Sequence, residues 1–224
     1  MKKVNSSSRN TEINTLSNQI IATATNANMS DDANLKPILD FITSTNAKLE
    51  SAINNGRAES EIEEADINVH NSTRAIFNLV SGYTYHPDIA IQEAANALKS
   101  ILDRYGLSVI YEGYANQLAF INSLLDDLKE TNALNSLEAL SGCSVLIDQL
   151  KNNQQVFSSK LLQYNEEKAK SKLEVSATEL KKELIKTINS KLIPYLKAML
   201  IVNSDNYKPF ASNVEQLIND INKS

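Results

Sequence analysis

The side chains with the greatest chemical potential lie in one short stretch, residues 82–88, where two phenols, an imidazole and a carboxylate come close together in the sequence. Histidine, carboxylate and phenol groups are the usual general acids and bases of enzymes, and they also bind small polar ligands. Four residues therefore form a candidate ligand-binding site: Tyr83, Tyr85, His86 and Asp88.

A structural role explains the same stretch more simply, and the sequence favours it. Gly82 can end one helix, Pro87 can stiffen a turn, and Asp88 can cap the helix that follows. Tyrosines have an apolar ring and a polar tip, which suits the half-buried end of a helical bundle. A connection between two helices is thus the first interpretation, and a ligand site is the second.

The rest of the chain offers little further chemistry. It has 1 Cys and 2 His, and neither histidine has a partner at the spacing of metal ligands. Cys143 follows Leu140 on an apolar stripe, which indicates an inert core thiol. Phosphate-binding glycine loops and nucleophile elbows are absent from the sequence. We expect no catalytic residue, no metal ligand and no cofactor, and a non-enzymatic protein rather than an enzyme.

Composition limits the class of protein further. The chain has 224 residues, with 22 Lys+Arg against 27 Asp+Glu, and 42% of its residues are hydrophobic. Its net charge of −5 argues against a nucleic-acid binder. No window approaches the ~18 apolar residues of a membrane span, and no apolar run follows the first residues as in a signal peptide. We therefore expect a bacterial cytoplasmic protein.

Hydrophobic residues recur with a period close to 3.6 along nearly the whole chain, which predicts helices. Only 5 Gly and 4 Pro leave too few turns for an all-β fold. The sequence therefore predicts an all-α protein, an elongated antiparallel bundle of about eight helices. The expected helices cover approximately residues 13–27, 35–53, 62–83, 91–105, 107–128, 140–164, 173–199 and 210–221.

Local signals predict how several of these helices begin, end or bend. Asn34 is the expected cap of the second helix, with Pro37 in its first turn, and Gly56 is expected to end it. Pro194 lies inside the long seventh helix, so a kink is expected about one turn before it. The last helix is expected to begin near residues 206–210, again with a proline in its first turn.

The order of the helices suggests an internal duplication. Residues 8–106 and 107–223 each hold four expected helices and would form two four-helix units packed as one globular body. The halves share little residue identity, so this prediction depends on helix lengths and order alone.

Several short motifs resemble an uncharacterised all-helical family, a domain of unknown function common in Bacteroidota. The resemblance extends over most of the chain, and it implies a helical fold without an assigned activity. The residues that carry it are Gly82-Tyr83-Thr84-Tyr85-His86-Pro87-Asp88 and Leu102-Asp103-Arg104-Tyr105-Gly106, with weaker matches at Arg9-Asn10-Thr11-Glu12, Leu35-Lys36-Pro37 and Tyr164-Asn165-Glu166-Glu167.

Two functional hypotheses remain. The first is a helical-bundle protein that acts by contact with a protein partner or with itself, since polar helix faces are plentiful and titratable groups do not converge. The second is a small-ligand-binding protein, with or without weak hydrolase or transferase activity, that uses the turn from Tyr83 to Asp88.

Overall fold

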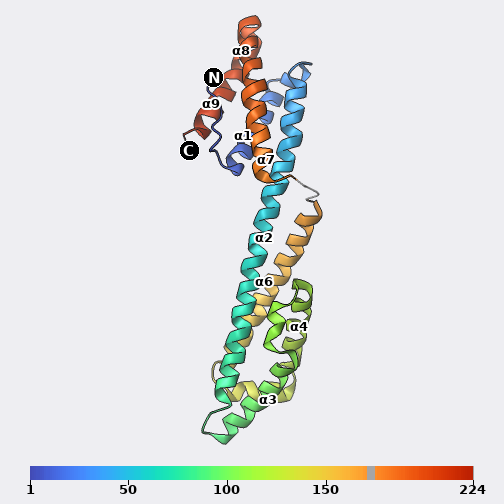
Figure 1. The fold of residues 1–224 in the computed structure, drawn as a ribbon, viewed down its shortest axis with the longest axis vertical. Coiled ribbons are helices and arrows are strands. Elements are labelled where there is room, and N and C mark those ends of the chain that lie inside the picture. The colour runs from blue at the N-terminus through green and yellow to red at the C-terminus, as the bar shows by residue number, and fades with distance from the viewer. Residues whose placement is uncertain (171–174, 224) are drawn as a thin grey trace. The chain divides into compact units, whose positions relative to one another are not determined.

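The computed structural model describes residues 1–170 and 175–223, and helices make up nearly all of these residues (Figure 1). The fold is all-α, as the hydrophobic periodicity predicts, and the described parts contain no strand. The α-helices are α1 (Asn10–Asn26), α2 (Lys36–Tyr83), α3 (Ile89–Tyr105), α4 (Tyr114–Asp127), α5 (Thr131–Ala139), α6 (Cys143–Lys170), α7 (Ala177–Thr187), α8 (Ile193–Val202) and α9 (Ser204–Ile221). Three shorter helical turns are η1 (Met29–Asp31), η2 (Leu107–Tyr111) and η3 (Ile188–Leu192).

The chain divides into two compact units. Unit 1 consists of Met1–Gly56 and Glu167–Ser224, whereas unit 2 is the single stretch Arg57–Glu166. These boundaries differ from the expected 8–106 and 107–223, because α2 contributes to both units and the chain returns to unit 1 in the last turn of α6. The internal duplication itself stays a prediction.

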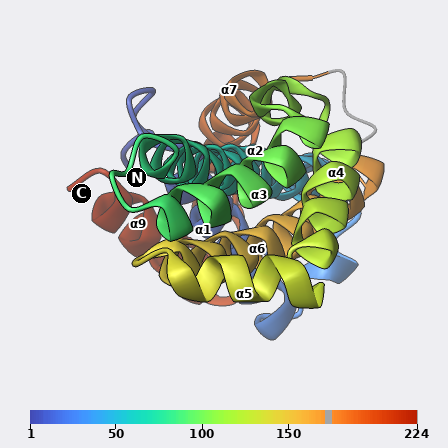
Figure 2. The ribbon, with the colours of Figure 1, turned by 90° about the horizontal axis from the view of Figure 1, so that it is seen from below.

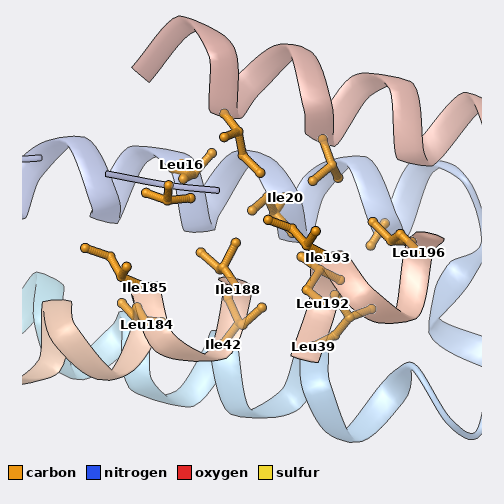
Figure 3. Close-up of a cluster of buried hydrophobic side chains, with 14 of the residues drawn as sticks. Leu16, Ile20, Leu39, Ile42, Leu184, Ile185, Ile188, Leu192, Ile193 and Leu196 are labelled. Carbon is orange, nitrogen blue, oxygen red and sulfur yellow. The ribbon is translucent and has the colours of Figure 1, made fainter. Parts of the chain in front are cut away.

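Unit 1 is built around a core of mainly aliphatic side chains from six helical elements. Figure 3 shows residues from α1, α2, α7, η3 and α8 that point toward one another. Leu16, Ile42 and Leu184 are completely buried, and α9 adds Phe210 and Val214 to the same cluster. Since burying a Leu or Ile side chain contributes about 1.5–3 kcal/mol, this cluster is the main source of the unit's stability.

A row of carboxamides crosses the contact between α1 and α2 beside this mainly aliphatic core. Asn46 is 2% exposed; its Nδ2 donates to Asn18 Oδ1 at 2.8 Å, and its Oδ1 accepts from Asn14 Nδ2 at 3.2 Å. The hydrogen bonds offset the cost of burying an amide there.

Unit 2 packs the second part of α2 against α3, α4, α5 and α6, which are labelled in Figure 2. Val69 and Ile76 of α2, Leu98 of α3 and Phe157 of α6 are among its buried residues. The rings of Tyr114 from α4 and Phe157 form a T-shaped pair, with 5.6 Å between centroids. The two units therefore have separate hydrophobic cores.

Gly56 does not end a helix, contrary to the prediction. It lies inside α2, which runs without interruption from Lys36 to Tyr83. A glycine within a helix costs roughly 1 kcal/mol relative to alanine, which apolar contacts on both sides of it can offset. The expected cap is also wrong, because Asp32 rather than Asn34 accepts the N–H groups at this end, from Asn34 at 2.9 Å and Leu35 at 3.2 Å.

The expected helix over 107–128 is two elements in the structure. The turn η2 comes first, and α4 begins only after Gly113, whose extended backbone separates the two. The prediction also missed α5, which precedes the sharp turn at Gly142, where φ is +85°. A left-handed backbone at this point favours glycine and separates α5 from α6.

The helix is irregular in the turn before Pro194, where the sequence predicts a kink. The turn η3, which is π-helical, lies directly before α8, and Pro194 is the second residue of α8. Proline has no N–H to donate to the preceding turn, so an irregular turn at this place is expected. The predicted start of the same helix, Leu173, lies outside the described residues. The last helix, α9, begins at Ser204, so Pro209 lies beyond its first turn and not within it as predicted.

Candidate functional site

The turn from Tyr83 to Asp88 has most of its polar groups bonded to the backbone. Tyr83 Oη donates to the carbonyl of Ser141 at 3.0 Å, and Asp88 Oδ1 accepts from the N–H of Ala90 at 2.8 Å as the cap of α3. His86 Nδ1 accepts from the N–H of Asp88 at 3.1 Å. These bonds correspond to the structural interpretation of the turn.

The four candidate residues do not converge on one concavity. Tyr85 is 86% exposed, and Asp88 is exposed as well. The rings of Tyr83 and His86 lie 6.1 Å apart at a tilt of 46°. The arrangement gives the ligand hypothesis no geometric support, and the assignment of a binding site to these residues stays a prediction.

A cavity of about 510 Å³ lies elsewhere in unit 2, among α4, α5 and α6. Residues at helical spacing form its walls, namely 122, 125, 126, 128 and 129 on α4 and just after it, 134, 137 and 138 on α5, and 144, 147, 148, 151, 154 and 155 on α6. A second hollow of about 600 Å³ adjoins it, because both share Asn122, Gln154 and Gln155. We call the two together the α4–α6 groove.

The floor of the groove is apolar. Leu125, Leu128 and Leu137 are buried there, and Ile147 is half-buried on the wall formed by α6. Leu134 of α5 is 46% exposed at the edge. An apolar hollow with a few polar groups is the usual form of a binding site.

Gln154 of α6 lines both hollows and is hydrogen-bonded to α4 between them. Its side chain is 3% exposed, and Nε2 donates to the carbonyl of Leu118 at 3.0 Å and to Asn122 Oδ1 at 3.2 Å. A backbone carbonyl can only accept, so the bond to Leu118 fixes which end of the carboxamide is the nitrogen. Gln154 therefore ties α6 to α4 along the bottom of the groove.

The rim of the groove carries both signs of charge. Asp126 and Lys129 pair with each other at 2.7 Å. Within the part of the chain that the structure describes, Glu138, Asp148 and Lys151 form no ion pair. The charges open to a ligand are therefore two carboxylates and one ammonium, which favours a cationic partner group.

Sequence reasoning missed this groove because it missed α5. The predicted helix over 107–128 includes Leu125 and Leu128, but the sequence prediction contains no helix opposite them. The signal that could have revealed it is the spacing of Ala133, Leu137 and Leu140, which puts three apolar residues on one helical face.

Three other titratable or reactive groups of unit 2 occupy structural positions. Cys143 is fully buried, which raises the pKa of its thiol and makes it a poor nucleophile. His70 Nε2 lies 3.1 Å from Asp66 Oδ1 on the same helix. The pKa of Tyr105 is raised to about 12. Burial is the main cause, and a hydrogen bond of 2.6 Å to Asp127 adds to it.

In unit 1 a carboxylate joins three elements. Tyr195 of α8 and Tyr207 of α9 both donate from their hydroxyls to Asp32 Oδ2. Burial by itself would raise the pKa of Asp32, but these two bonds and those from Asn34 and Leu35 outweigh it and lower the pKa. We call this arrangement the Asp32 clasp.

The described parts of the chain contain neither a candidate metal cluster nor a candidate membrane-spanning helix. Across residues 1–170 and 175–223, no group of three or more His, Cys, Asp or Glu side chains is placed to hold a metal ion. None of the helices over the same residues is long and apolar enough to cross a membrane.

Comparison with known proteins gives a family but no relative of known activity. No curated protein and no solved structure matches the chain. A family model described as a family of unknown function (DUF6261) matches residues 59–222. Since this match covers well over half of the sequence, the chain belongs to that family of unknown function.

Proposed function

We propose that this chain is a non-enzymatic helical protein that acts by binding another protein, and that the α4–α6 groove of unit 2 is its recognition surface. The observation that carries the proposal is the groove itself, which combines an apolar floor with a rim whose unpaired charges are mainly acidic. Grooves between helices commonly take the apolar face of a partner segment.

The chemistry of the rim defines the partner. Leu125, Leu128 and Leu137 offer apolar contact, while Glu138 and Asp148 have no ion-pair partner among the described residues. A segment with two or three aliphatic side chains and a neighbouring Lys or Arg fits both properties. Electrostatic complementarity of this kind contributes to specificity and to the rate of association.

The wider setting is part of the same proposal. We infer a bacterial protein, with the Bacteroidota distribution of the related family, that works in the cytoplasm and has arisen by internal duplication. A small ligand bound at the turn from Tyr83 to Asp88 is the alternative. It has less support, because the side chains of Tyr83, His86 and Asp88 form hydrogen bonds with the backbone.

Site-specific photo-crosslinking tests the proposal. A benzophenone amino acid at position 134 samples the edge of the groove, and the same amino acid at position 67 is the matched control, because Leu134 and Ile67 are 46% and 55% exposed in the same unit. The labelled protein is irradiated in the cells that encode it, and cross-linked peptides are sequenced by mass spectrometry.

We expect position 134 to form one dominant adduct with an aliphatic peptide that carries a Lys or Arg, and position 67 to form none. Equal and scattered adducts at both positions, or no protein adduct at position 134, would refute the proposal.

A further inference from the structure

We propose that the occupant of the α4–α6 groove is a second copy of this chain, which inserts the end of its helix α8. This inference rests on the proposed function, since it names the partner for the same groove. It follows from an apolar projection in unit 1 whose properties match those of the groove in unit 2.

The projection is the last turn of α8, residues Leu200, Ile201 and Val202, which we call the α8 tip. Leu200 is half-buried and packs against the core of unit 1, whereas Ile201 is 87% exposed and Val202 is 78% exposed. These two are neighbours in the sequence and are among the most exposed large aliphatic side chains of the described chain. Paired exposure of this kind marks an interaction site more often than a single exposed leucine does.

The tip is also well prepared for binding. Ile and Val are branched at Cβ and have few rotamers, so their burial costs little side-chain entropy. The helix beneath them is anchored by Leu196 and Met199, which belong to or pack against the unit 1 core. A rigid projection loses less freedom on docking than a flexible loop does.

Charge complements shape. Lys197 lies one helical turn before Ile201, and Lys208 follows on α9; both are exposed, and no other described residue forms an ion pair with either. Glu138 and Asp148 on the rim of the groove are also unpaired. With the tip on the apolar floor, Lys197 can reach these carboxylates.

A contact between two different surfaces has a definite consequence for assembly. Each copy offers one tip and one groove, so the association is head-to-tail and adds copies one after another unless the geometry closes a ring. Two exposed side chains bury far less than the ~800 Å² per partner of a standard interface, so the association is weak. We expect dissociation constants of about 10 μM to 1 mM.

Two variants separate the tip from the groove. The tip variant carries Ile201→Asp and Val202→Asp, and the groove variant carries Leu134→Asp and Glu138→Lys; all four positions are exposed, so both chains should fold. Ile67→Asp is the matched control on another face of unit 2. Circular dichroism melting checks that each variant is folded, and sedimentation equilibrium up to 1 mM, the upper end of the range expected for weak contacts, gives the mass.

We expect the wild type and Ile67→Asp to gain mass steadily with concentration, and each variant alone to associate at least tenfold more weakly than the wild type. A mixture of the two variants should form a one-to-one dimer, because the tip variant keeps its groove and the groove variant keeps its tip. A wild type that is monomeric throughout, or a mixture that stays monomeric while the wild type associates, would overturn the inference.

The two proposals can fail separately. An adduct at position 134 that maps to another protein, together with a monomeric wild type, removes the self-association and keeps the groove as a protein-binding surface. Absence of any adduct at position 134 removes both.

Discussion

The Asp32 clasp should contribute measurably to the stability of unit 1. Asp32→Ala removes the acceptor of two phenol hydroxyls and of two backbone N–H groups. Hydrogen bonds to a charged group contribute about 1.5–3 kcal/mol each, and the lower figure applies because Asp32 is only half-buried. Two phenol bonds then give a loss of about 3 kcal/mol in the free energy of unfolding.

Urea unfolding followed by circular dichroism measures this loss. With a slope of about 2 kcal/mol per M, a loss of about 3 kcal/mol lowers the midpoint by about 1.5 M. Asp205→Ala is the matched control, because Asp205 is an exposed carboxylate on α9 that forms no ion pair with another described residue. If the two variants have the same midpoint, the clasp contributes nothing and the reasoning fails.

The same comparison has a defined pH dependence. The pKa of Asp32 lies below its ordinary value of 3.8 in the folded protein, so its ionised form is favoured by folding. The stabilisation is therefore fully present above pH 3.8 and is lost as the pH falls through the folded pKa. The difference between wild type and Asp32→Ala should be constant from pH 5 to 8 and shrink toward pH 3, whereas an unchanged difference at pH 3 would contradict the assigned role of the charge.

Three further predictions concern packing, backbone and reactivity. Leu184→Ala should lower the free energy of unfolding by about 2–5 kcal/mol because Leu184 is fully buried, whereas the half-buried Ile147 should cost less; thermal melts of the two variants check this order. Gly56→Ala should stabilise by about 0.5–1 kcal/mol in an open position inside a helix, and Gly142→Ala should destabilise at a φ of +85°; opposite shifts in melting temperature are expected. The buried thiol of Cys143 should react with a thiol reagent far more slowly in the native protein than in denaturant, and equal rates would show that it is accessible.

Helix type and several helix ends follow from local sequence, because the forces that set them are local. Asp88 caps α3, and Gly106 ends it with φ at +71°, both as predicted from residues only a few positions apart. The π-helical turn before Pro194 is equally local, since the proline lacks an N–H group to donate to it. The structural interpretation of the turn between α2 and α3 also agrees with the hydrogen bonds found there.

Tertiary packing decided the features that were missed. Gly56 is a sufficient stop signal for an isolated helix, but α2 has packed faces before and after it, and no local rule measures that. The α4–α6 groove needs walls from three helices, one of which was not predicted at all. Because the groove exists only where these helices leave a space, its location could not be read from any one of them.

The carboxamide row between α1 and α2 bears on how unit 1 reaches a single arrangement. Aliphatic side chains such as Ile13, Leu16 and Ile20 repeat every three or four residues. A shift of α1 by one turn, about 5.4 Å, would therefore still place apolar side chains of α1 against apolar side chains of α2. The same shift would separate Asn14 and Asn18 from Asn46, and leaving the buried Asn46 amide without partners costs about 1–3 kcal/mol. Apolar packing thus holds the two helices together, while the hydrogen bonds among three asparagines select one axial alignment from several that apolar packing alone would allow.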